Sequence, residues 1–322
     1  MSNLLSRYAD AIFWLARYVE RAEDLARILD VNETFSRDSQ GAQNWQSILR
    51  IYTLAERFRE QHGEPTADAV ITFFTLDDSN PGSVVSTLGA ARENARTLRP
   101  LISTEMWTQL NIFYNRVRAM SGDELSEPRL ARFCATIKEG CQTHTGITEG
   151  TFYRDEGWYF YRLGRNLERA DQTTRLLDVK YHMLLPSVDQ VGSPLDVSQW
   201  NALLRSAAGY HAFRRIQPSG MTPADVAGFL LFHRRFPRSV AACIADVDTQ
   251  LHELRRSYGL DGGAAALERL DALRARLSEA TIDVIIRRGL HQFLDDLQSE
   301  IGAVTFDLAN DFFGTRPVQA AQ

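Results

Sequence analysis

The sequence LARYVERA at residues 15–22 returns as LGRNLERA at residues 163–170, shifted by 148 positions. Between residues 15–31 and 163–179, nine of the seventeen aligned positions are identical, where unrelated sequences would share about one. Both copies contain the dipeptide Glu-Arg, and we call each copy an ER motif. The repetition predicts an internal duplication of one helix, with pseudo-repeats that start near residues 4 and 152.

Apolar residues around both motifs recur at steps of three and four, which is the period of an amphipathic helix. The best strand candidate, residues 69–74, is short enough to be a buried helix segment, and we assign it to a helix. Clusters of breaking residues interrupt the helical pattern near residues 39–44, 63–66, 77–82, 99–100, 121–128, 186–194, 217–221, 236–237 and 260–263. We therefore predict an all-α fold, a single bundle of about ten helices over residues 1–314, with a disordered tail at 315–322.

The composition excludes several classes of protein. The chain has 322 residues, with 36 Lys+Arg against 41 Asp+Glu, so it lacks the basic excess that binding to nucleic acid or an anionic membrane requires. No apolar run is long enough to span a membrane, and charges interrupt the N-terminal stretch where a signal peptide would be apolar. We expect a cytoplasmic protein.

Cysteine and histidine usage gives no sign of a metal site or a cofactor. The three cysteines, Cys134, Cys141 and Cys243, are too few and too scattered for a disulfide framework or a zinc site. Among the seven histidines no metal-binding spacing occurs. A cysteine nucleophile at Cys134 or Cys141, with His144 nearby, is the alternative to ordinary buried thiols. We predict that the chain holds neither a metal nor a cofactor.

The helical wheel places the charged residues of each ER motif on one stripe. Arg17, Glu20, Asp24 and Arg27 lie opposite the apolar arc. Solvated ion pairs contribute little and drift freely, so a pattern that occurs twice favours a fixed role. Two alternatives stay open: a buried network between helices, or a paired site. For the site, the candidates are Glu20 and Glu168 as catalytic carboxylates and Arg17, Arg21, Arg165 and Arg169 as substrate-binding groups.

Two further groups of polar residues are candidates for binding. Glu93 with Arg96, and Glu105 with Trp107, could line a substrate pocket, although helix caps and packing explain them equally well. The turn that contains Arg234, Arg235 and Arg238 could receive a phosphate or the acidic loop of a partner. The alternative is a solvated basic turn.

Several segments in order resemble the bacterial alpha-E proteins, an all-helical family named for its Glu-Arg motif. They are residues 6–23, 91–96, 102–107, 157–170, 181–186 and 236–240. Ala16 departs from the pattern, since the second copy keeps Gly164 at this position. The resemblance covers essentially the whole chain. It implies a partner, a circularly permuted ATP-grasp protein encoded beside or fused to the chain, and often a transglutaminase-like peptidase.

The resemblance implies a part in a peptide-ligation or peptide-modification system. No Gly-Lys-Ser/Thr phosphate loop and no dinucleotide fingerprint occurs in the sequence, so ATP would bind to the partner. Our leading expectation is an accessory subunit that orients a peptide or amino-acid substrate. The alternatives are an enzyme of amide chemistry that uses the two ER motifs, and a structural oligomerisation module. Whether the chain has catalytic activity of its own stays open.

Overall fold

The computed structural model describes residues 4–38, 43–120, 122–125, 127–183, 194–218 and 220–314. Within these residues all regular secondary structure is helical, which confirms the predicted all-α class. The elements are α1 (Ser6–Asp38), α2 (Gln43–Ile51), α3 (Ala55–His62), α4 (Ala67–Thr75), α5 (Val84–Thr97), α6 (Thr104–Arg118), η1 (Gly122–Leu125), α7 (Glu127–Thr151), α8 (Glu156–Met183), α9 (Pro194–Ser206), α10 (Tyr210–Ile216), α11 (Pro223–Phe232), α12 (Val240–Tyr258), α13 (Ala264–Glu279), α14 (Ile282–Arg288) and α15 (Leu290–Phe312).

The described residues form fifteen α-helices, so the prediction of about ten was wrong. The additional breaks separate α2 from α3, α7 from α8, α9 from α10, α13 from α14 and α14 from α15. Two of these breaks turn through Thr53 (φ 57°) and Ala208 (φ 55°). Residues other than glycine rarely adopt this left-handed conformation, so composition gives no warning of it. Most of the predicted break at 186–194 and the tail at 315–322 lie outside the described residues.

Hydroxyl side chains begin several helices where the sequence pattern indicates a start. The predicted helix at 69–74 is confirmed as part of α4, whose N-cap Thr66 accepts a hydrogen bond from the backbone of Ala69. Thr222 caps α11 in a full capping box with Asp225. Ser239 caps α12 in the same way as Thr66 caps α4. These caps satisfy backbone N–H groups that the first helical turn leaves without partners.

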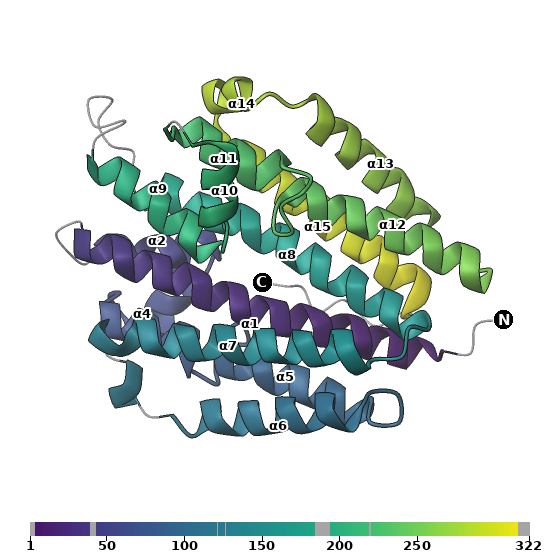
Figure 1. Cartoon of the computed structure of the whole chain (residues 1–322). Coiled ribbons are helices and arrows are strands. Elements are labelled where there is room, and N and C mark those ends of the chain that lie inside the picture. The colour runs from purple at the N-terminus through teal and green to yellow at the C-terminus, as the bar shows by residue number, and fades with distance from the viewer. Residues whose placement is uncertain are drawn as a thin grey trace.

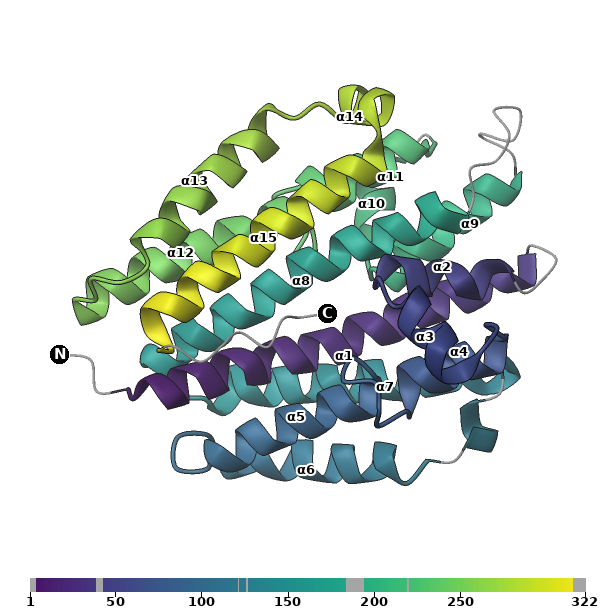
Figure 2. The same ribbon diagram turned by 180° about the vertical axis from the view of Figure 1, so that it is seen from behind.

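The long helices α1 and α8 lie along each other through the middle of the molecule (Figure 1). On one side α5 and α7 pack on α1, and α6 packs on both of them at the outer edge. On the other side α12 and α15 pack on α8, and α13 packs on both of them (Figure 2). The two halves are therefore arranged in the same order around the α1–α8 pair.

A glycine sets how closely these two central helices approach. A Cβ atom on Gly164 of α8 would lie 2.3 Å from the backbone carbonyl oxygen of Phe13 in α1. The obstacle is backbone, which cannot rotate away as a side chain can. The two helices could therefore not keep this spacing with any larger residue at position 164.

Gly164→Ala should lower the free energy of unfolding by about 1–3 kcal/mol, because the new methyl group forces α1 and α8 apart. Gly146→Ala in α7 is the matched control, since a Cβ there meets nothing within 4 Å. The control should raise stability by about 0.5–1 kcal/mol, as alanine normally does in a helix. Urea unfolding followed by circular dichroism measures both changes. Equal effects of the two substitutions would contradict the close approach.

Candidate functional site

The two ER motifs meet where α1 and α8 pack together, and they exchange partners. Arg21 donates from Nε to Oε1 of Glu168 (2.7 Å) and from Nη2 to Oε2 (3.0 Å). Arg169 donates from Nε to Oε1 of Glu20 (2.6 Å) and from Nη2 to Oε2 (2.8 Å). Each guanidinium thus binds a carboxylate in the bidentate geometry that gives the strongest ion pairs. The glutamate of each motif pairs with the arginine of the other.

Glu168 is fully buried, and further donors fill its remaining acceptor positions. Nε of Arg17 lies 2.7 Å from Oε2 of Glu168, and Nε2 of Gln172 donates to Oε1 at 3.0 Å. Arg17 also donates to the hydroxyl of Thr305 in α15 (3.1 Å), and its guanidinium lies 4.9 Å from the ring centroid of Trp14. No lone pair of Glu168 is left facing open space for a substrate.

Glu20 is 2% exposed, and its second cation comes from a distant part of the chain. Arg238 donates from Nη1 to Glu20 (3.0 Å) and Asp24 (2.7 Å), and from Nη2 to Glu23 (2.5 Å). It immediately precedes the N-cap Ser239, so the start of α12 fixes its backbone. Three carboxylates of α1 need a buried cation, which explains why Arg238 points inward.

This position differs from the one that the sequence suggested for Arg238. We grouped it with Arg234 and Arg235 on a turn available to a partner. Those two side chains are exposed, whereas Arg238 is enclosed in the charged cluster. Only Arg234 and Arg235 of that group therefore remain accessible.

The charged cluster continues to two more helices through Glu23 and Arg27 of α1. Arg27 donates from Nη2 to Glu23 (2.6 Å) and from Nη1 to the backbone carbonyl of Ser206 at the end of α9. Gln142 of α7 donates to the same carboxylate at 3.2 Å. The cluster thus connects α1 with α7, α8 and α9 and with the start of α12. We call the mutually paired residues of this cluster the ER network: Arg17, Glu20, Arg21, Glu23, Asp24, Arg27, Glu168, Arg169, Gln172 and Arg238.

Electrostatics keep both ER glutamates ionised. Burial alone would raise the pKa of Glu20, but the charges of Arg169 and Arg238 outweigh it and hold that pKa below its usual range. Burial is likewise the largest influence on Glu168, and Arg21 and Arg17 reverse it, so its pKa is also lowered. A carboxylate held this firmly in the charged form is a poor general acid or base near neutral pH.

Asp24 is the exception within the ER network. Burial raises its pKa to about 8; Arg238 and Arg27 only partly offset this, and the nearby Glu20 and Glu23 add to it. Its Oδ2 atom is buried and has no hydrogen-bond partner among the described residues. Beside it lies a cavity of about 10 Å³, lined by Arg27 and Gln172 among others. That volume is close to the minimum for one water molecule and far below that of a peptide.

The repeat is not reproduced in every contact. Arg165, the counterpart of Arg17, pairs with Glu149 of α7 at 2.8 Å, whereas Arg17 pairs across the interface with Glu168. Sequence reasoning also missed Glu23 and Gln172. Glu23 lies off the stripe of the helical wheel, and Gln172 replaces the aspartate of the first copy. Listing the positions at which the two copies of the motif differ would have drawn attention to Gln172, which aligns with Asp24.

The second predicted group lies on the outer side of the bundle. Glu93 of α5 is half exposed and pairs with Arg92 (2.6 Å) and Arg96 (2.8 Å). The ring of Trp107 in α6 lies 5.6 Å from the guanidinium of Arg92, and Glu105 is exposed in the first turn of α6. α5 and α7 separate α6 from α1 (Figure 1). This group is therefore apart from the ER network.

The three cysteines are buried free thiols, and burial raises the pKa of each. Burial also lowers the pKa of His144 to about 4. This environment opposes the thiolate and imidazolium that a cysteine nucleophile needs.

One group, Asp178, His291 and Asp295, has the geometry of a metal site in the described residues. However, His291 directs Nδ1 to Asp178 (2.9 Å) and Nε2 to Asp295 (3.4 Å), so each of its ring nitrogens faces a carboxylate.

Asp24→Asn should change the pH dependence of stability. The pKa of Asp24 is higher in the folded chain (about 8) than in the unfolded chain (3.8), so the folded state binds more protons between these values. The proton that folded Asp24 retains contributes to the free energy of unfolding. This contribution is complete below pH 4 and falls as the pH rises toward 8, by up to about 1.4 kcal/mol per pH unit. The variant lacks this loss, so it should gain stability relative to the wild type as the pH rises from 5 to 8.

Urea unfolding of both proteins across this range measures that difference. His144 titrates with the opposite sign, since its folded pKa is lowered, but it is present in both proteins and cancels. A difference in stability that stays constant with pH would show that Asp24 is ionised throughout.

Two uncharacterized proteins, from Mycobacterium bovis and Mycobacterium tuberculosis (strain CDC 1551 / Oshkosh), are each 23% identical to the chain over 331 residues. The alignments cover 96% of the chain but only 37% of each relative, so the chain spans little more than a third of their length. No solved structure matches the chain. In the described residues, no helix combines the length and apolar character that crossing a membrane requires.

The paired geometry of the two motifs agrees with a match to a family of helical domains. The family is described as a predicted alpha-helical domain with a conserved ER motif, and its model covers residues 4–313. Both ER motifs and all the residues of the ER network lie within this range. The chain therefore belongs to the Alpha-E family.

Proposed function

We propose that the chain is an accessory module of an ATP-dependent peptide-ligation system, and that the ER network is its internal clamp. The observation that carries the proposal is the state of Glu20 and Glu168. Both carboxylates are buried, ionised and bound by arginines. The cavity of about 10 Å³ beside Asp24 is lined by neither of them and has room for about one water molecule. An enzyme that used them as acid and base would need to bring them into contact with a substrate.

Two further observations support an accessory role. The chain aligns with 37% of the length of its mycobacterial relatives, so in those proteins the helical unit is part of a larger polypeptide. The sequence lacks the glycine-rich loops that bind nucleotide phosphates, so a partner would bind the ATP. The partner that the family resemblance implies is a circularly permuted ATP-grasp protein. Because ligation consumes ATP, the proposal places the complex in the cytoplasm.

The arrangement of the two halves supports an internal duplication that extends beyond the ER motifs. Residues 80–84 (NPGSV) precede and begin α5, and residues 236–240 (FPRSV) precede and begin α12, a shift of 156. Thr66 and Thr222 cap α4 and α11 with the same shift. In the second copy the glycine of NPGSV is replaced by Arg238, which supplies the cation for α1. The proposed duplication thus explains why the two halves of the clamp are nearly equivalent and why the second half has one additional cation, Arg238.

Co-expression with the circularly permuted ATP-grasp protein tests the proposal. We expect a complex in size-exclusion chromatography with light scattering, and faster formation of the ligated product by mass spectrometry when the chain is present. Light scattering of the chain alone also tests the alternative of a homo-oligomerisation module. Failure to associate, together with full activity of the partner alone, would contradict the accessory role.

Glu20→Gln separates the accessory role from an enzymatic one. If Glu20 is part of a clamp, the variant should unfold at lower urea concentration, yet it should stimulate the partner normally under conditions where circular dichroism shows it folded. If Glu20 is an acid or base, the folded variant should lose about 10²–10⁴-fold in rate. Glu253→Gln, which alters an exposed pair with Arg256, is the control.

A further inference from the structure

An open groove with an aromatic floor lies between α10, α11 and the turn that follows α11. Its volume is about 310 Å³. Phe213 and Phe229 form the floor, with ring centroids 5.5 Å apart, and Phe236 stacks on Phe229 at 4.6 Å. Ile216 on the rim is 47% exposed. We call this feature the α10–α11 groove.

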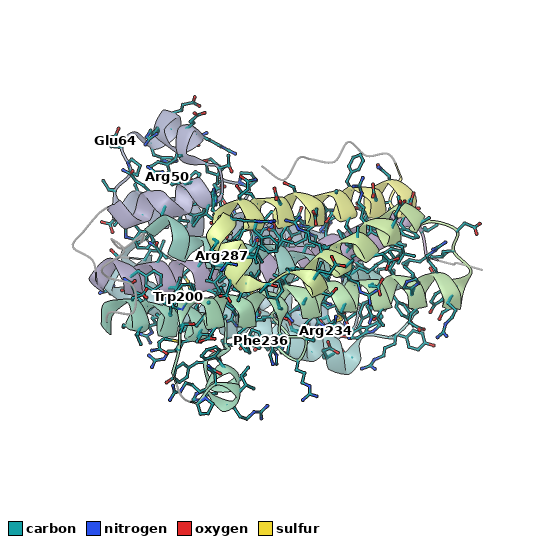
Figure 3. The ribbon with its side chains drawn as sticks, turned by 90° about the horizontal axis from the view of Figure 1, so that it is seen from above. Arg50, Glu64, Trp200, Arg234, Phe236 and Arg287 are labelled. Atoms are coloured by element: carbon teal, nitrogen blue, oxygen red, sulfur yellow. The ribbon has the colours of Figure 1, made fainter. Side chains whose placement is uncertain are left out.

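Six exposed arginines lie on α10, on the turn after α11 and on α14, the elements that border this groove or pack on α11. Two precede Ile216 on α10, two follow His233 in the turn, and α14, which packs on α11, ends with two more. They are Arg214, Arg215, Arg234, Arg235, Arg287 and Arg288. All six are exposed, and within the described parts of the chain none of them has an ion pair or hydrogen bond. Figure 3, which looks onto the side of the molecule where α14 lies, labels Arg234, Phe236 and Arg287.

This local charge is opposite in sign to that of the whole chain, which has a formal net charge of −5. The one carboxylate that lines the groove, Asp225, is engaged in the capping box of α11. An approaching anionic segment would therefore meet arginines that have no internal partner to give up. Arginines of this kind favour carboxylates through bidentate hydrogen bonds.

His233 is a polar residue in the lining of the groove. Its ring lies 5.2 Å from that of Phe229, and its Nδ1 atom is buried without a hydrogen-bond partner in the described residues. A buried polar atom without a partner costs free energy unless a ligand or water supplies one. The groove therefore combines an aromatic floor with a few polar side chains, and arginines lie on the elements that border it.

The first half of the chain closes the corresponding place with its own residues. There Phe58 and Phe73 form the aromatic pair, at 5.2 Å. The ring of His62 covers both, at 5.0 Å and 5.4 Å, and its Nε2 atom lies 3.2 Å from Oδ2 of Asp77. An aromatic side chain tied to a carboxylate thus fills the first-half position, while the second half leaves it open. A segment that fills the groove in the same way would offer an apolar or aromatic side chain and a carboxylate.

We propose that the α10–α11 groove binds an acidic segment of a partner protein. An apolar or aromatic side chain of that segment packs over Phe213 and Phe229, and flanking carboxylates pair with the arginines on the elements that border the groove. A nucleic acid fits less well, because the floor is a small apolar hollow and the rest of the chain is acidic. This groove would serve the accessory role proposed above, but the peptide test below needs no ligase, so the two can fail separately.

The test is fluorescence anisotropy with a short labelled peptide in which Phe and Leu stand four residues apart among Glu and Ala. Ile216→Glu and the double variant Arg214→Glu/Arg215→Glu should each weaken binding by at least about tenfold. The matched controls are Ile112→Glu, at another exposed isoleucine, and Arg59→Glu/Arg116→Glu, with the same change of net charge. Both controls should bind as the wild type does, and circular dichroism confirms that every variant is folded.

Three results would overturn the proposal. The first is equal binding of the peptide by all variants. The second is sensitivity to the arginine changes without sensitivity to Ile216→Glu, which would indicate non-specific attraction between charges. The third is tighter binding of a duplex DNA probe than of the peptide, with the same dependence on the groove variants, which would assign the surface to nucleic acid.

Discussion

The exchange of arginine and glutamate between α1 and α8 is the interaction on which the rest of the structure depends. Removing four such charges from water is costly, and only close, bidentate pairing compensates for it. The pairs Arg21–Glu168 and Arg169–Glu20 meet this condition, with Nε to carboxylate distances of 2.7 Å and 2.6 Å. They can form in only one register of the two helices, and the contact at Gly164 fixes the spacing. The outer helices then pack on each half in the same order.

Two populations of arginine follow from this arrangement. The chain contains only two lysines, Lys138 and Lys180, so residue type alone does not distinguish the arginines. Burial and pairing do. Those of the ER network have their carboxylates within the same cluster, whereas the arginines on the elements that border the α10–α11 groove face solvent and have no partner among the residues that the structure describes. The first population holds the fold, and the second is available for binding.

Helical periodicity made the all-α fold predictable, and the repetition of the ER motif at a shift of 148 positions drew attention to Glu20 and Glu168. The pairing between motifs could not be derived, since it depends on how two helices cross. Arg238 joins Glu20 from 218 residues away, a contact that only the tertiary fold creates. Two of the five missed helix breaks are left-handed turns at Thr53 and Ala208, which leave no mark in the composition. The α10–α11 groove depends on the second of these turns.

A double-mutant cycle on Glu20 and Arg169 tests the central claim most directly. Glu20→Gln and Arg169→Met should each lower the free energy of unfolding by about 3–5 kcal/mol, because each leaves a buried charge without its partner. The double variant should lose less than the sum of the two, with a coupling of about 1.5–3 kcal/mol. The exposed pair Glu253–Arg256 provides the reference, with an expected coupling below about 0.5 kcal/mol. If the two buried substitutions are additive, or cost nothing, the ER network does not hold α1 and α8 together.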